Sequence, residues 1–398
     1  MPAASSGRPQ LEVADILRAY GEVYARDHRV SVPQATVLRH LVDCRTAALG
    51  GHVDRCASCD QVRISYNSCR DRHCPKCQSL KKAEWLEARR ERLLPVPYWH
   101  VVFTLPEALR PIGVRNKRIL YKLLFDAAAS TLLTLARDPR HLGADIGFTA
   151  ILHTWTQDLK FHPHVHCVVT GGGLRRDGCR WIPARDHFFI PVRVLGRLFR
   201  GKFLDALAEA RRQGKLEGGA ACLTRPAAWK KLLDRLYGTD WVVYAKPPFG
   251  GPEHVFSYLG RYTHRVAISN QRLVAVDDNG VTFTVKDRDD GSAKKPVTVG
   301  HGEFIRRFLL HLLPRGFTRI RHYGLLATGN ARRRLERARE LLTPKPEAPA
   351  ARDATPGRPE VWWQRLFRLT GIDVMRCPYC GSGRLVREVV ALAARPPP

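Results

Sequence analysis

The chain has 398 residues, enough for a substantial hydrophobic core and, at typical domain sizes, for roughly two to three domains. The 66 Lys and Arg residues exceed the 37 Asp and Glu residues, which gives a net charge of +29. Such a charge favours binding to a polyanion such as nucleic acid, because binding releases the counterions of the phosphates. No apolar run approaches the ~20 residues of a membrane helix, and the N-terminal MPAASSGRPQ lacks a hydrophobic signal region. We therefore expect a cytoplasmic protein without a membrane partner, whose 11 cysteines are metal ligands or buried thiols rather than disulfides.

Two amphipathic helices, predicted at residues 10–28 and 33–48, lead into a cysteine-rich segment. In that segment two Cys-x2-Cys knuckles flank a hairpin-like stretch at 61–66, a spacing typical of a tetrahedral structural zinc site. The predicted Zn²⁺ ligands are Cys56, Cys59, Cys74 and Cys77. A possible second set of nitrogen and sulfur ligands is Cys44, His52, Cys69 and His73, some of which could equally be buried thiols or surface imidazoles. The sequence thus predicts one or two structural zinc ions.

The elements that follow alternate between helices and strands. In chain order they are a helix at 79–94, a strand at 98–105, a helix at 114–137, strands at 147–157 and 163–170, a hairpin at 179–183, helices at 192–214 and 226–237, and a strand at 240–245. The glycine run at 171–173 is expected to end the second of the two middle strands. Both helices and strands are therefore expected in this part of the chain.

The strand at 163–170 carries a His-hydrophobic-His triplet. Side chains alternate along a strand, so His164 and His166 share one face while Val165 points into the core. Two neutral imidazoles on one face can share a divalent cation. A turn through Lys160 would bring Gln157 near this pair as a third ligand; Asp158 and His153 are alternatives, and Gln157 could equally be a polar strand end.

A helix beginning at Pro252 carries two tyrosines one turn apart. Tyr258 and Tyr262 are at i and i+4 and so lie on a common helix face, where they could be nucleophiles or core packing. Strands are then predicted at 264–269, 272–277 and 281–286, a helix at 301–313, a strand at 317–321 and a basic helix at 331–342. The last segment holds Cys377 and Cys380, a lone knuckle that would need ligands from elsewhere to bind zinc.

With these residues in place, the chain resembles the two-tyrosine HUH transposases of bacterial rolling-circle insertion sequences, relatives of the Helitron transposases. The stretches that carry the resemblance are HVDRCASCDQVRISYNSCRDRHCPKCQ, WHVVFTLPE, HTWTQDLKFHPHVHCVVTGGG and YLGRYTHRVAISNQRL, in order over much of residues 40–275. The resemblance implies that His164 and His166 hold a catalytic Mg²⁺ or Mn²⁺ and that Tyr258 and Tyr262 are paired nucleophiles. It also implies an α+β fold with a ferredoxin-like or RRM-like antiparallel sheet flanked by helices, and leaves Gln157 as the candidate third ligand.

The domain organisation expected on this basis has five parts. They are a helical and zinc-binding DNA-recognition domain at 1–94, an HUH catalytic domain at 95–325, a basic helix at 326–342, a flexible linker at 343–359 and a C-terminal segment at 360–398. The expected function is a nucleoid-associated bacterial transposase that nicks and rejoins single-stranded element ends through a 5′-phosphotyrosine. Trp155, Phe161 and Trp181 are candidate stacking residues for the bases, with core packing as the favoured alternative. The alternatives are a replication-initiating or conjugative nickase and a non-enzymatic zinc-finger regulator, the latter leaving the histidine and tyrosine pairs without a role.

Overall fold

The structure is a computed structural model that describes residues 11–77, 79–90, 92–185, 190–218, 221–246, 260, 267–287, 293–327, 329, 331–343, 360–371 and 373–390. The chain divides into two compact units, each assembled from separate segments. One comprises Met1–Glu87, His264–Leu312 and Ala350–Pro398, and the other comprises Ala88–Thr263 and Leu313–Pro349. Residues 264–312, which the predicted domain at 95–325 includes, thus belong to the unit that contains the N-terminal cysteines.

The first unit contains a helical part built on α1 (Val13–Asp27), α2 (Val32–Asp43) and α10 (His301–Leu310). Buried residues on one face of α1, among them Ile16 and Leu17, pack it against α2 and α10, and Tyr20 of α1 stacks on His301 with 3.7 Å between ring centroids. A three-stranded antiparallel sheet adjoins these helices, with strand order β10-β9-β8. Its strands are β8 (Leu273–Asp277), β9 (Gly280–Lys286) and β10 (Lys294–Val299).

The predicted hairpin of this sheet is present, whereas residues 267–269, predicted as part of a strand, are irregular. The sequence did not predict β10, because its Lys-Lys-Pro start is polar and lacks an apolar alternation.

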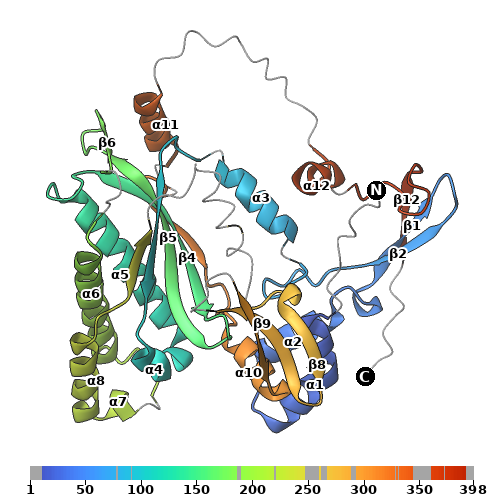
Figure 1. The fold of residues 1–398 in the computed structure, drawn as a ribbon, viewed down its shortest axis with the longest axis horizontal. Coiled ribbons are helices and arrows are strands. Elements are labelled where there is room, and N and C mark those ends of the chain that lie inside the picture. The colour runs from blue at the N-terminus through green and yellow to red at the C-terminus, as the bar shows by residue number, and fades with distance from the viewer. Residues whose placement is uncertain are drawn as a thin grey trace. The chain divides into compact units, whose positions relative to one another are not determined.

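The first unit also contains the sheet β12-β1-β2, which joins both ends of the chain. Its strands are β1 (Gly51–Cys56), β2 (Val62–Tyr66) and β12 (Leu385–Val390), and Figure 1 shows β12 beside β1 and β2. The short helix η1 (Ala47–Leu49) precedes β1, and α12 (Trp362–Thr370) lies in the C-terminal segment. Neither α12 nor β12 was predicted. The helix α3 (Ser79–Arg90) follows the cysteine-rich segment.

The second unit is organised around a six-stranded sheet with strand order β11-β4-β5-β3-β7, to which β6 adds by pairing with β5. The strands are β3 (Tyr98–Thr104), β4 (Asp145–Trp155), β5 (Phe161–Leu174), β6 (Trp181–Pro183), β7 (Val243–Lys246) and β11 (Ile320–Gly324). Every pair is antiparallel, so the chain is a mixed α/β protein with antiparallel sheets. The histidine strand, β5, lies between β4 and β3 in the sheet.

Helices cover one face of this sheet (Figure 1). The long α5 (Lys117–Arg137) packs on β4 and β5, and α6 (Val192–Arg212) packs on α5 and β7. Phe161, Val165 and Cys167 of β5 are buried on this helix-covered side, and Tyr121 of α5 lies 6.4 Å from Phe161 between ring centroids. Because residues alternate along β5, the histidines lie on the opposite face. The remaining elements are η2 (Glu107–Leu109), α4 (Arg110–Arg115), α7 (Ala221–Thr224), α8 (Pro226–Gly238), η3 (Asn270–Arg272) and α11 (Ala331–Leu342).

The glycine run that was expected to end the histidine strand lies inside β5 instead. A Cβ atom at Gly171 would lie 2.7 Å from the carbonyl oxygen of Pro97, and one at Gly173 would lie 2.6 Å from that of Asp145. The glycines therefore allow neighbouring backbones to approach closely rather than turning the chain.

One described helix, α5, is long and apolar enough to cross a membrane by length and composition alone, which differs from the sequence expectation. Most of its apolar stretch is buried inside the protein, because the helix packs on α6 and the sheet. Burial of this kind is typical of a core helix.

Candidate active site and metal centres

Three imidazoles converge on the face of the sheet opposite α5. His164 and His166 lie on β5, and His153 on the neighbouring β4 pairs directly with His164 in the strand register. One ring nitrogen from each of the three lies within 4.8 Å of the others. The ring of His153 is 4.4 Å from that of His166 and 5.4 Å from that of His164, between centroids. The antiparallel register thus places the three side chains where a single ion could contact all of them.

Hydrogen bonds to the other ring nitrogens orient two of these imidazoles. The Nδ1–H of His164 donates to the backbone oxygen of His162 over 2.7 Å, which leaves Nε2 of His164 as its ligand atom. Nδ1 of His166 lies 2.9 Å from Nε2 of His100 on β3. If Nε2 of His166 binds metal, its Nδ1–H donates to His100. The sequence reasoning missed His100, although a buried polar residue in the apolar stretch Trp99–Phe103 was a signal for it.

Burial keeps the imidazoles of His164, His166 and His100 neutral. It lowers the pKa of His164 to about 4, and it lowers the pKa of His166 well below its ordinary value, with a further decrease from the neighbouring His153. Burial, and then the positive charge of Lys246, lowers the pKa of His100 to about 4. At neutral pH the side chains therefore carry the uncharged nitrogens that bind divalent ions.

The three-imidazole donor set fits a divalent transition ion. Of the two ions expected from the sequence, Mn²⁺ suits nitrogen ligands better than Mg²⁺, which prefers oxygen ligands and keeps several waters.

Two oxygen ligands considered from the sequence lie in the turn between β4 and β5. Gln157 is exposed in that turn, and its role as third ligand stays a prediction. Asp158 accepts a hydrogen bond from Thr156 and forms an ion pair with Lys160 over 2.8 Å. Of the two alternatives to Gln157, His153 is grouped with the histidine pair and Asp158 is not.

An aromatic and a basic side chain extend the same face of the sheet at its edge. Tyr244 of β7 pairs with Val102 of β3, which pairs with His166 of β5, so the side chains of all three residues point to the same side. Tyr244 is 44 % exposed, and the Lys246 ammonium lies 5.6 Å from the centre of its ring. Solvent can therefore reach an aromatic and cationic surface beside the histidines.

The stacking residues expected from the sequence differ in exposure. Phe161 and Trp181 are buried in the core, which leaves no ring face for a nucleobase. Trp155 is half-buried and stacks on His153 with 4.7 Å between ring centroids. The predicted nucleophiles Tyr258 and Tyr262 lie outside the described residues.

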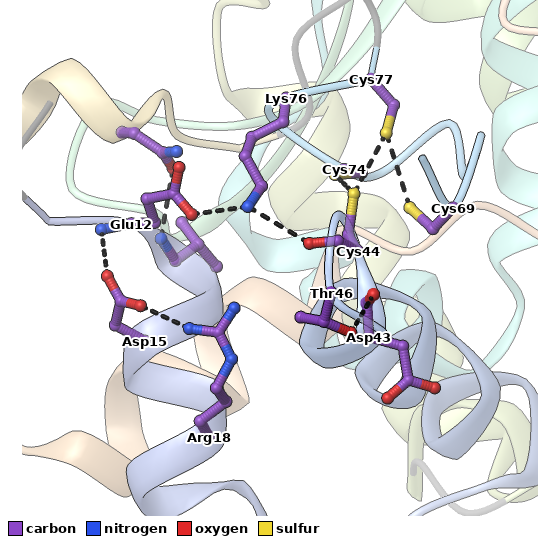
Figure 2. Close-up of polar contacts among 12 residues, drawn as sticks. Glu12, Asp15, Arg18, Asp43, Cys44, Thr46, Cys69, Cys74, Lys76 and Cys77 are labelled. Carbon is purple, nitrogen blue, oxygen red and sulfur yellow. Dashed lines mark hydrogen bonds and ion pairs between the residues drawn. The ribbon is translucent and has the colours of Figure 1, made fainter. Parts of the chain in front are cut away.

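Four cysteine sulfurs converge at the base of the β1–β2 hairpin (Figure 2). The members of this base cluster are Cys44, Cys69, Cys74 and Cys77. The Sγ atom of Cys77 lies 3.3 Å from that of Cys44 and 3.6 Å from that of Cys69. Lys76 forms an ion pair with Glu12 over 2.6 Å, which ties the loop of the second knuckle to the start of α1.

The second cysteine cluster joins the N-terminal and C-terminal segments, and its members are Cys56, Cys59, Cys377 and Cys380. The predicted grouping of Cys56 and Cys59 with Cys74 and Cys77 is therefore not the one that the structure adopts. The reason is geometric: the Cys56–Cys59 knuckle forms the turn of the β1–β2 hairpin, whereas the other knuckle lies near its open end. A strand of the length of β1 separates the two ends by roughly 17 Å.

The predicted second zinc set is not assembled either. Cys44 and Cys69 join the base cluster, while both histidines lie beside carboxylates. His73 Nδ1 is 2.9 Å from an oxygen of Asp71, and His52 Nε2 is 3.8 Å from an oxygen of Asp54.

Comparisons with known proteins place the chain among transposases. A family model described as "Transposase zinc-binding domain" matches residues 16–105, and one described as "Putative transposase" matches residues 147–334. The chain is 52 % identical over 378 residues to "Putative transposase y4qJ" of Sinorhizobium fredii, covering 94 % of each chain. It is 29 % identical over 349 residues to "Transposase for insertion sequence element IS801" of Pseudomonas savastanoi pv. phaseolicola, covering 86 % of this chain and 80 % of that one. No solved structure is significantly similar to it.

Proposed function

Since this chain belongs to the transposase family of the IS91/IS801 type, we propose that it nicks and rejoins single-stranded DNA at the ends of an insertion element, in rolling-circle transposition. The observation that carries the proposal is the convergence of His153, His164 and His166 on the face of the sheet opposite α5, within the segment that matches the transposase family. Neutral, oriented imidazoles such as those of His164 and His166 can hold the divalent ion that a metal-assisted phosphoryl transfer needs. We infer that these residues belong to an HUH nuclease core.

When bound, a divalent ion at His153, His164 and His166 supplies positive charge that polarises the scissile phosphate. The hydroxyl of Tyr258 or Tyr262 attacks the phosphorus atom and loses its proton, and the bond from phosphorus to the 3′ oxygen breaks. The products are a 5′-phosphotyrosine and a free 3′-OH, and a later attack of a 3′-OH on the phosphotyrosine rejoins a strand. Because the phosphodiester energy is conserved, the cycle needs no ATP. With two tyrosines, one can hold a strand while the other cleaves.

The edge of the sheet supports a single-stranded substrate. Tyr244 offers an exposed ring on which a base can stack, and Lys246 beside it can neutralise a phosphate. Both point to the same side as His166, so a strand lying across β7 and β3 would bring a phosphate toward the imidazoles.

The zinc-binding domain supports recognition of the element. We infer that Cys44, Cys69, Cys74 and Cys77 hold one Zn²⁺, because their sulfurs already lie at the separations of a tetrahedral thiolate site. Arg70, an exposed residue beside Cys69, and exposed arginines of α11 can contact phosphates. Some arginines of α11 are used internally: Arg334 forms an ion pair with Asp145 over 2.6 Å, whereas Arg332 is largely exposed.

The test is an adduct assay with full-length protein, Mn²⁺ and single-stranded oligonucleotides that carry the element ends. Wild-type protein should form a covalent protein–DNA adduct, and the double variant Tyr258→Phe with Tyr262→Phe should form none. The matched control is Tyr237→Phe, an exposed tyrosine of α8, which should leave the adduct unchanged. An adduct that persists in the double variant would remove the tyrosines from the mechanism. DNA binding without any adduct in the wild type would favour the non-enzymatic regulator.

A further inference from the structure

The C-terminal knuckle that lacked partners in the sequence finds them in the turn of the β1–β2 hairpin. Cys56 Sγ lies 3.7 Å from Cys380 Sγ, and Cys59 Sγ lies 3.7 Å from Cys377 Sγ. All four sulfurs lie within 4.8 Å of one another. A tetrahedral zinc ion with bonds of about 2.3 Å holds its sulfur ligands about 3.8 Å apart. These separations fit such an ion and are too long for a disulfide bond of about 2.0 Å.

The two knuckles have the same backbone geometry. The amide of Ser58 donates to Cys56 Sγ and the amide of Tyr379 donates to Cys377 Sγ, each over 3.4 Å. The residue after each second cysteine has a positive φ, 55° at Asp60 and 69° at Gly381. Each turn is closed by a further backbone bond, from Asp60 N to Cys56 O at 3.1 Å and from Gly381 N to Cys377 O at 3.0 Å. Amide donors around sulfur stabilise the thiolate form that binds zinc.

Further donors surround Cys380. The amide of Gly383 donates to its Sγ atom over 3.2 Å, and the hydroxyl of Ser382 donates to it over 3.8 Å. Gly383 also permits the close approach of the two segments, because a Cβ atom there would lie 2.3 Å from Cys56 Sγ.

The backbone around the cluster is continuous across the two segments. β12 pairs antiparallel with β1 so that Leu385 lies opposite Cys56, and the amide of Ala57 donates to the carbonyl oxygen of Arg384 over 3.0 Å. The buried carboxylate of Asp54 accepts a hydrogen bond from Arg387 of β12 over 2.9 Å. The cluster is therefore part of a formed sheet and not a chance approach of two loops.

We propose that Cys56, Cys59, Cys377 and Cys380 form a discontinuous zinc centre that fastens the C-terminal segment to the zinc-binding module. Half of its ligands lie beyond the stretch, residues 16–105, that matches the zinc-binding family. The centre holds β12 against β1 of the zinc-binding domain. Helix α12 contacts β12 in turn, because the guanidinium carbon of Arg387 lies 4.9 Å from the ring centre of Trp362. Chelation or cysteine oxidation would release this segment, whether or not the nuclease chemistry proposed above is correct.

The first experiment measures zinc in the purified full-length protein. The double variant Cys377→Ser with Cys380→Ser should contain one zinc ion fewer per chain than the wild type. The matched control Cys179→Ser changes an exposed cysteine outside both clusters and should keep the wild-type zinc content. A double variant that retains the wild-type zinc content would overturn the proposal. Replacing zinc by Co²⁺ gives a second readout, because the visible spectrum should lose half of its tetrathiolate intensity in the double variant.

The second experiment tests the fastening directly. A specific protease site is inserted between residues 344 and 359, and the cut protein is analysed by gel filtration. The C-terminal fragment should coelute with the rest of the chain when zinc is bound, and should separate after chelation or in the double variant. A fragment that separates in the zinc-loaded wild type would refute the fastening role. A Cys380→His variant, which keeps a zinc ligand at the same position, should retain both the zinc and the coelution.

Discussion

The contact between His100 and His166 makes a quantitative prediction about metal affinity. His100 is 5 % exposed, and its Nε2 lies 2.9 Å from Nδ1 of His166. In the variant His100→Phe a ring of similar size replaces the imidazole, but His166 loses this acceptor. Removing the hydrogen-bond partner of a metal-binding histidine typically weakens the metal about 10- to 100-fold, which corresponds to about 1.4–2.7 kcal/mol. We expect a loss of Mn²⁺ affinity in this range.

The assay is a titration of full-length, zinc-loaded protein with Mn²⁺, in which the electron paramagnetic resonance signal of the free ion reports binding. His100→Gln, whose side-chain oxygen can accept a hydrogen bond, should lose less affinity than His100→Phe. The control His141→Phe changes a histidine in the turn after α5 and should bind Mn²⁺ as the wild type does. If His100→Phe binds Mn²⁺ as tightly as the wild type, His100 does not orient His166 and the assignment of the ligand nitrogens is wrong.

Three further predictions follow from named contacts. His153→Ala should weaken Mn²⁺ binding at least tenfold in the same titration, whereas Gln157→Ala should leave it unchanged. If Gln157→Ala loses more Mn²⁺ affinity than His153→Ala, the third ligand is Gln157. Tyr244→Ala should weaken binding to single-stranded DNA by about 5- to 150-fold, since stacking on one base is worth about 1–3 kcal/mol, and fluorescence anisotropy with Tyr237→Ala as control would measure it. Asp145→Asn should lower the free energy of unfolding by about 1.5–3 kcal/mol near neutral pH in urea denaturation. Burial alone would raise the pKa of Asp145, but hydrogen bonds from Arg137 and Arg334 outweigh this effect and lower the pKa. The ionised carboxylate of Asp145 therefore contributes to the free energy of unfolding above about pH 4, and this contribution is lost as the pH falls through the lowered pKa of the folded state. If the variant remains less stable than the wild type in acid, this reasoning is wrong.

The histidine strand was predictable because its pattern is local. A period of two in Phe161–Cys167 places the histidines on one face and Val165 in the core, and the structure has Val165 fully buried. The family resemblance was confirmed by the comparisons, and the transposase assignment with it. Local periodicity also located α5, α6, α8 and the β8–β9 hairpin.

The grouping of the cysteines was not predictable from spacing. Each knuckle has the same Cys-x2-Cys pattern, so the sequence does not say which two knuckles share an ion. The partition follows from the length of the β1–β2 hairpin, which separates its turn from its open end, and from the pairing of β12 with β1. Cys56 and Cys380 are far apart along the chain, so no local pattern connects them. The strand that brings them together, β12, begins only after the C-terminal knuckle of Cys377 and Cys380.

The position of His153 shows how the strand register decides which side chains meet across a sheet. Alternation alone places His153, Trp155 and Gln157 on one face, but only while the strand continues. β4 ends at Trp155, and the chain turns through Leu159, whose φ of 63° is left-handed, with the amide of Thr156 donating to the carbonyl oxygen of Lys160 over 3.0 Å. Once the turn is fixed there, antiparallel pairing sets His153 opposite His164 and leaves Gln157 in the turn itself. The side of the sheet to which a side chain points was thus predictable from the sequence. Its partner on the neighbouring strand was not, because the register depends on where the turn begins.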